Sequence, residues 1–142
     1  MSSVLARFRK ISEMEFYRTA YELRSKLTVM LMNENIVPKR YRPVFTFPTI
    51  DRARIMIEHI IIAYNVYPNK PELVDQRKAA QKAAIDDLDM IDDQLQYLID
   101  TLFKGKIDAD RPLPGSLEEC GDLIDRARAL LVAWRKSTKL IK

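Results

Sequence analysis

The side chains that could do chemistry are few in this sequence of 142 residues. It contains one histidine, His59, and one cysteine, Cys120, which excludes an intrachain disulfide and most cysteine-based metal sites. Carboxylates concentrate in residues 85–100, IDDLDMIDDQLQYLID, but a di-iron centre in a helical protein needs Glu-x-x-His pairs on opposing helices. We therefore expect no catalytic residue, no metal site and no cofactor. The acidic run is interpreted as a solvated helix face.

The histidine follows an arginine in the sequence RIMIEH, residues 54–59. Arg54-x4-His59 resembles the Arg-x4–6-His motif of the HEPN ribonucleases, which are helical bundles. The resemblance implies an arginine and a histidine, paired across a dimer, that act on the RNA 2′-hydroxyl. Ile55 stands where that family favours a polar residue. The alternative is a structural or merely exposed His59, which we favour.

Binding chemistry concentrates in VPKRYRPVFTFPTIDRARIM, residues 37–56. Cations in such a segment can neutralise phosphates or contact acidic protein. The candidate residues for binding nucleic acid or a partner are Lys39, Arg40, Arg42, Arg52 and Arg54. Three aromatic residues lie among them, Tyr41, Phe45 and Phe47. These rings could stack on unpaired bases or pack as a lid over one end of the fold, and we favour packing.

Composition limits the classes of protein to which the chain can belong. With 47% hydrophobic and 31% charged residues, it is predicted to be neither disordered nor membrane-spanning. No apolar run approaches the roughly 20 residues of a transmembrane helix. The N-terminal sequence MSSVLARFRK is not followed by the apolar region of a secretion signal, so we expect a cytoplasmic protein.

The elements that must position these side chains are helices. Apolar periodicity predicts four of them, and no strand, within a single domain, residues 1–142. The predicted helices lie at about residues 12–34, 49–67, 71–103 and 116–138, after a basic arm at 1–11. Because short loops join amphipathic helices, we expect an all-α, antiparallel up-down four-helix bundle.

Local signals predict where three of these helices begin. Ser12 with Glu15, and Ser116 with Glu119, have the spacing of capping boxes, and a proline opens the third helix at position 71. The second helix is apolar around most of its circumference. Such a surface is typical of a helix that packs against its own core and against a neighbouring copy of the chain.

Charge is distributed unevenly along the chain, whose net charge is +4. The first 70 residues hold twice as many cations as acids, whereas residues 85–100 carry six acids and no cation. Residues 126–142 carry six cations and no acid. In an up-down bundle, the basic segment at 37–56 and the basic C-terminal segment would lie at different ends.

The stretch VPKRYRPVFTFPTID resembles the start of the second helix in small four-helix-bundle proteins of the 23S rRNA intervening-sequence type. It looks closest to their relatives in diversity-generating retroelements, the accessory variability determinant proteins. The similarity continues through IIIAYN, the long third helix and IDRARALLVAW, and covers about residues 14–137. Phe47-Pro48 departs from the Leu-Gly step that is common in those relatives.

The resemblance implies a non-enzymatic protein that assembles as a ring-shaped homopentamer. It further implies binding to a reverse transcriptase and its template RNA, in support of mutagenic reverse transcription. Two alternatives stay open: an intervening-sequence-type binding protein without a retroelement, and a ribonuclease that uses Arg54 and His59. A reverse-transcriptase gene beside this one would separate the first alternative from the retroelement function.

Overall fold

The computed structural model describes residues 10–107 and 110–142, and within them the chain is helical with no strand. The all-α class predicted from the sequence is confirmed. The long helices are α2 (Glu15–Leu31), α3 (Arg42–Asn65), α4 (Pro71–Leu98) and α5 (Gly115–Ser137). A short 3-10 turn, η1 (Lys39–Tyr41), leads into α3, and a π-helical turn, η2 (Ile99–Phe103), extends α4.

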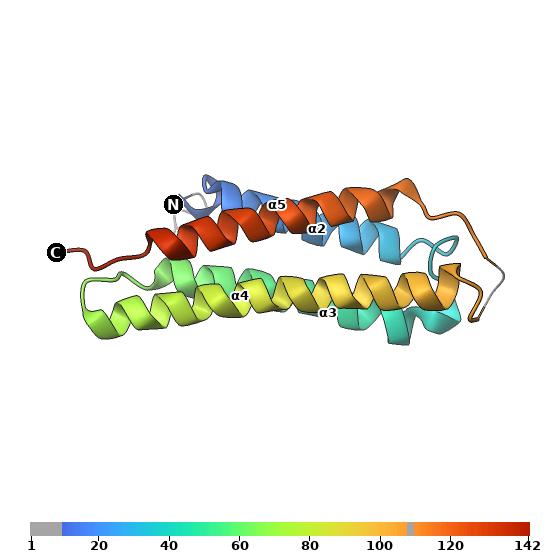
Figure 1. Ribbon diagram of the computed structural model, residues 1–142, viewed down its shortest axis with the longest axis horizontal. Helices are drawn as coiled ribbons and strands as arrows, with labels where there is room; N and C mark the ends of the chain where they lie inside the picture. Colours follow the sequence, from blue (N-terminus) through green and yellow to red (C-terminus); the bar gives the residue numbers. More distant parts are fainter. Residues whose placement is uncertain (1–9, 108–109) are drawn as a thin grey trace, which may run out of the picture.

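The four long helices lie side by side along the long axis of the molecule, and consecutive helices run in opposite directions (Figure 1). Helix α2 packs against α3 and α5, and α4 also packs against α3 and α5. One end of the molecule therefore holds η1, the start of α3 and the connection from α4 to α5. The other end holds the turn between α3 and α4 and the C-terminus (Figure 1). Residues 1–9 of the predicted basic arm lie outside the described residues.

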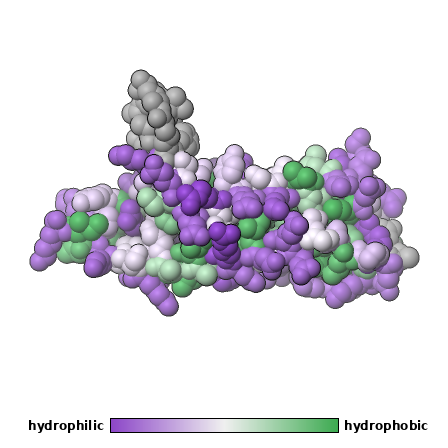
Figure 2. All heavy atoms as spheres, turned by 90° about the horizontal axis from the view of Figure 1, so that it is seen from above, coloured by the Kyte–Doolittle hydropathy of each residue, from purple (hydrophilic) through white to green (hydrophobic). Residues whose placement is uncertain are grey.

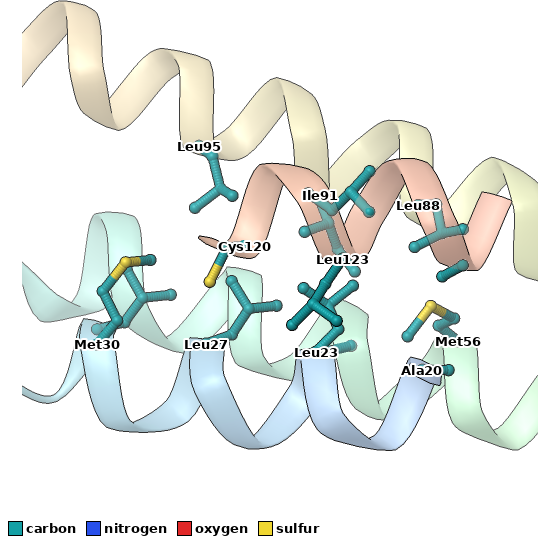
Figure 3. Packing of buried hydrophobic residues seen from close by; sticks show 14 of the residues in the cluster. Ala20, Leu23, Leu27, Met30, Met56, Leu88, Ile91, Leu95, Cys120 and Leu123 are labelled. Carbon is teal, nitrogen blue, oxygen red and sulfur yellow. The ribbon is translucent and has the colours of Figure 1, made fainter. Parts of the chain in front are cut away.

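All four long helices contribute to one hydrophobic core. Figure 3 shows Leu27 of α2, Met56 of α3, Ile91 of α4 and Cys120 of α5 pointing into the space between the helices, and all four are fully buried. Burying an apolar side chain of this size stabilises the fold by about 1.5–3 kcal/mol. Burial raises the pKa of the Cys120 thiol to about 11, so this residue is a neutral, small apolar group, as predicted.

Helix α3 begins at Arg42, seven residues before the predicted start near position 49, and so includes Pro48. A proline inside a helix lacks the N–H that would bond the carbonyl four residues earlier, here Val44. Val44 is half-exposed, which leaves its carbonyl near water. Two contacts with the end of α2 hold these first turns: Arg42 donates to the Met32 carbonyl at 2.8 Å, and Thr46 Oγ1 donates to the Leu31 carbonyl at 2.7 Å. Tertiary contacts thus override the local effect of Pro48, and the helix begins earlier than its periodicity predicted.

Both predicted capping boxes are wrong, although the helices beside them exist. Helix α2 begins at Glu15 with Met14 as its N-cap residue, and α5 begins at Gly115 with Pro114 as its N-cap residue. Neither N-cap residue makes a side-chain hydrogen bond that caps its helix. Ser116 is already inside the first turn of α5, two residues after the N-cap position. The proline at the start of α4 does occupy the first turn, as predicted.

Arg111 ties the segment between α4 and α5 to the end of the molecule that holds η1. Its guanidinium donates to the carbonyls of Asn35 at 2.9 Å, Ile36 at 3.2 Å and Leu102 at 3.3 Å. It also lies 4.1 Å from the centre of the Phe103 ring, within the range of a cation–π contact. One arginine therefore fixes the loop that precedes η1 and thereby positions the basic residues at 39–42.

Candidate nucleic-acid and partner interface

Lys39 and Arg40 are the two predicted binding residues that are exposed and form no ion pair within the described residues. Both are exposed on η1, at the corner of the molecule where the chain enters α3. The Arg40 guanidinium lies 4.7 Å from the centre of the Tyr41 ring. Neither side chain forms an ion pair with any residue in the described part of the chain. We call residues 39–42 the basic corner.

Arg42, the third member of the basic corner, has a structural contact instead. Its Nη2 donates to the Met32 carbonyl, beyond the last turn of α2, where helix carbonyls have no intrahelical partner. The side chain is half-buried, and among the described residues its Nε has no hydrogen-bond partner. Because Arg42 holds α2 to α3, replacing it would perturb the fold as well as any binding surface.

Arg52 and Arg54 lie 10 and 12 residues beyond Arg42, the last residue of the basic corner, which is roughly 15–18 Å along the axis of α3. Arg52 contacts Asp87 of α4 at 3.3 Å. Arg54 forms ion pairs with Asp51, at 2.9 Å, and with Glu58 on its own helix. The hydrogen bond from Arg54 to Asp51 is the main cause of a raised pKa for this arginine. The structure thus separates the five predicted cations into an accessible corner and a distant, internally neutralised pair.

The three aromatic residues of the segment have different environments. Phe45 is buried, with its ring centre 5.4 Å from that of Tyr97 and 6.5 Å from that of Tyr41, so these two rings of the segment pack as a lid. Phe47 is 53% exposed and, with Pro43, lines an open hollow of about 480 Å³. The remaining lining residues are Pro48, Ile50 and Asp51. Of the three rings, that of Phe47 is the most exposed.

A polar network between α3 and α4 contains a residue that the sequence prediction misplaced. Asp87 was expected on the solvated acidic face, yet it is only 4% exposed. Its Oδ2 lies 2.6 Å from Nδ1 of His59, and its Oδ1 accepts a hydrogen bond from Arg52. Burying a carboxylate is costly unless it is paired. The side chains of His59 and Arg52 provide this pairing for Asp87. The spacing Ala84–Asp87–Ile91 follows the buried seam of α4, so the sequence did contain the signal.

The same geometry bears on the ribonuclease alternative. His59 contacts Asp87 across the helix interface, whereas Arg54 contacts Asp51 and Glu58 on the outer side of α3. Residues five apart on a helix differ by about 140° in direction, because each residue turns the helix by about 100°. Within one chain, the structure therefore does not bring Arg54 and His59 together.

Two further findings describe the site's surroundings. Residues 10–107 and 110–142 contain no group of three or more histidine, cysteine, aspartate or glutamate side chains that could hold a metal ion. None of the helices in this part of the chain is both long enough and apolar enough to cross a membrane.

Comparison with known proteins adds no assignment. No protein-family model matches the sequence, and neither a curated protein nor a solved structure matches the chain.

Proposed function

We propose that the protein is a non-enzymatic accessory factor of a diversity-generating retroelement that binds a reverse transcriptase and its template RNA. In this proposal it acts in the cytoplasm and supports mutagenic reverse transcription. Its unit is an antiparallel up-down four-helix bundle, and the units assemble into a ring-shaped homopentamer. The basic corner is the contact surface, with Lys39 and Arg40 as the charged residues that approach the partner.

The observation that carries the proposal is the pairing of free charge with open apolar surface at the basic corner. Lys39 and Arg40 have no acidic partner in the part of the chain that the structure describes, and the half-exposed Phe47 lies two turns further along the same stretch of helix. Exposed cations attract phosphates and acidic protein, whereas a neighbouring apolar hollow adds contact area that survives at high salt. A surface with both properties suits a ribonucleoprotein partner.

The outer stripe of α3 supports self-association. Val44, Phe47 and Ile62 are each more than half exposed and lie on the outer side of the helix, with the ion pairs of Arg54 to Asp51 and Glu58 on the same side between Phe47 and Ile62. Seen from above, the face formed by α2 and α5 is mainly hydrophilic, with separated hydrophobic groups (Figure 2). Exposed apolar stripes are unusual on monomers, so α3 is the helix that we expect to meet a second copy.

Binding is tested by co-purification of the tagged protein with a reverse transcriptase encoded beside its gene and with that element's template RNA. Lys39→Glu together with Arg40→Glu should abolish co-purification of the reverse transcriptase and leave helicity unchanged. Asp86→Lys with Asp93→Lys, a charge reversal of equal size on α4, should retain it. Arg42→Glu is left out of this test because Arg42 holds α2 to α3. Full co-purification of the double corner variant at physiological salt would remove the basic corner from the proposal.

Assembly is tested separately by native mass spectrometry. The expected species has five times the chain mass of 16.6 kDa. Ile62→Glu places a charge in the outer stripe of α3 and should dissociate the ring, whereas Gln76→Glu on the exposed side of α4 should not. A stable monomer of the unaltered protein at micromolar concentration would contradict the assembly.

A further inference from the structure

At the end of the molecule opposite the basic corner, the C-terminal segment continues outward from α5 and lies beside the turn between α3 and α4 (Figure 1). The backbone N–H of Ile141 donates to the Pro68 carbonyl at 2.9 Å. Thr138, just beyond α5, is buried and exchanges hydrogen bonds with Gln81 of α4 at 2.9 and 3.2 Å. These contacts bring residues 138–142 beside residues 67–70, which are about seventy positions away in the sequence.

This arrangement gathers lysines from two distant parts of the chain. Four exposed lysines lie at this end, and we call them the terminal lysine cluster: Lys70, Lys136, Lys139 and Lys142. In residues 10–107 and 110–142, none of the four forms an ion pair. Glu72 and Asp75, at the start of α4, are the nearest acids in the sequence to Lys70, and neither pairs with the cluster. The lysine charges are therefore open to solvent.

The arginines at the same end are committed to the fold. Arg77 donates to the carbonyls of Ala63 at 3.0 Å and Tyr64 at 3.2 Å, at the C-terminal end of α3. Arg135 donates to the Lys78 carbonyl at 3.1 Å. Burial lowers the pKa of Arg77, as expected for a cation held against the protein interior. The free positive charge at this end consequently comes from flexible lysine side chains, which bind phosphates as point charges.

An exposed aromatic ring lies within the same surface. Tyr67 is 60% exposed, directly before Pro68, and Leu140 and Ile141 are 44% and 38% exposed. Proteins that bind single-stranded nucleic acid without reading its sequence combine a positive surface with an aromatic ring on which a base stacks. An anionic membrane would instead require a broad apolar helix face, and residues 138–142 lie outside α5. The left end of Figure 2 accordingly shows a small hydrophobic group surrounded by hydrophilic surface.

We infer that the terminal lysine cluster, with Tyr67, is a binding site for single-stranded RNA. The lysines contact the phosphate backbone, and the Tyr67 ring stacks on an unpaired base. This inference goes beyond the proposed function, because it places RNA at the end opposite the basic corner and does not require the polymerase. A strand that occupies this site leaves Lys39 and Arg40 accessible to a protein.

The test measures the fluorescence anisotropy of a labelled 20-nucleotide oligouridylate at several salt concentrations. Each lost phosphate contact should reduce the slope of log affinity against log salt by about 0.7. Lys136→Gln, Lys139→Gln and Lys142→Gln together should therefore reduce the slope by about 2 and weaken binding at least ~10-fold at low salt. Tyr67→Ala should weaken binding about fivefold without changing the slope, because stacking involves no counterion release.

The matched control neutralises three lysines elsewhere, Lys82→Gln, Lys104→Gln and Lys106→Gln, and circular dichroism verifies the fold of each variant. This control should bind nearly as tightly as the unaltered protein. The inference is overturned if the control loses as much affinity as the cluster variant, if the cluster variant keeps its affinity and slope, or if Tyr67→Ala binds normally. It is also overturned if the cluster variant binds phosphatidylserine vesicles more weakly but keeps its affinity for the oligouridylate. Lys39→Glu with Arg40→Glu should retain oligouridylate binding, so this result and the co-purification result can fail independently.

Discussion

At each end of the molecule, some cationic side chains donate to backbone carbonyls and others stay exposed without an ion pair among the described residues. The two ends differ in how many cations belong to each group. At the end that holds the basic corner, Arg42 and Arg111 donate to backbone carbonyls, and Lys39 and Arg40 stay free near an apolar hollow. At the terminal end, Arg77 and Arg135 donate to carbonyls, and four lysines stay free. Arginine presents several donors in a planar fork, which suits carbonyl groups at helix ends, whereas lysine keeps its charge hydrated. At the terminal end, residue type therefore separates the cations that hold the fold from those that can bind a partner, whereas Arg40 is a free arginine at the other end.

The largest effect should come from Arg111→Ala, because this arginine alone joins three carbonyls from two segments of the chain. We expect the free energy of unfolding to fall by about 3 kcal/mol, given 1.5–3 kcal/mol for a single hydrogen bond from a charged group and incomplete additivity. Urea denaturation followed by circular dichroism measures the change. Lys106→Ala, in the same connecting segment, should stay within about 0.5 kcal/mol. If Arg111→Ala and Lys106→Ala lose equal free energy of unfolding, the distinction between cations that hold the fold and cations that stay free is wrong.

Arg77→Ala tests the same distinction at the terminal end. It removes two hydrogen bonds to the end of α3 and a cation over the Trp134 ring, whose centre lies 5.7 Å away. We expect a loss of about 2 kcal/mol in urea denaturation. The comparison variant is Lys70→Ala, which should be nearly neutral for stability while weakening RNA binding. A destabilised Lys70→Ala would show that the cluster is part of the fold.

Arg42→Ala should have a smaller effect, because a single hydrogen bond is lost and the side chain is half-buried. We expect about 1.5 kcal/mol, measured as before. Arg40→Ala changes a neighbouring arginine that contacts only an adjacent ring, and its effect on stability should stay below about 0.5 kcal/mol. If Arg42→Ala and Arg40→Ala are equally destabilised, the distinction between a structural Arg42 and a free Arg40 is wrong.

The smallest effect should come from Arg54→Ala. Its two carboxylate partners lie on the same exposed side of α3, where solvent and salt screen the attraction. We expect a slightly lower thermal midpoint at low salt and no resolvable difference from the unaltered protein at 1 M sodium chloride. A large, salt-insensitive loss would mean that Arg54 has a structural role like that of Arg111.

The sequence predicted the helical class and the start of α4 because these depend on local periodicity and on one proline. It also predicted that Lys39 and Arg40 lie outside the core, because they come before the periodic part of the helix. It could not show that Arg42 bonds the Met32 carbonyl, since that contact depends on where α2 ends. The role of Arg111 was missed for a similar reason, because its partners lie about 75 positions away in a loop without periodicity.

Asp87 shows a different limit. Its position on the buried seam of α4 was visible in the spacing of the neighbouring apolar residues, but the surrounding aspartates suggested a uniformly solvated face. Only the packing of α3 against α4 shows that His59 and Arg52 share this one carboxylate. A residue's type was therefore a weaker guide to burial than its position in the helical repeat.

Pro48 has a consequence for how the molecule opens. Because it cannot donate to the Val44 carbonyl, the first turns of α3 depend on the contacts of Arg42 and Thr46 with the final residues of α2. The end of α2 and the start of α3 should therefore lose their amide protection together, as one cooperative unit in hydrogen–deuterium exchange. The second half of α3, with an uninterrupted ladder and a fully buried Ile60, should exchange far more slowly. A partner seated on the basic corner would then slow exchange in α2 as well, although it touches only η1 and the start of α3.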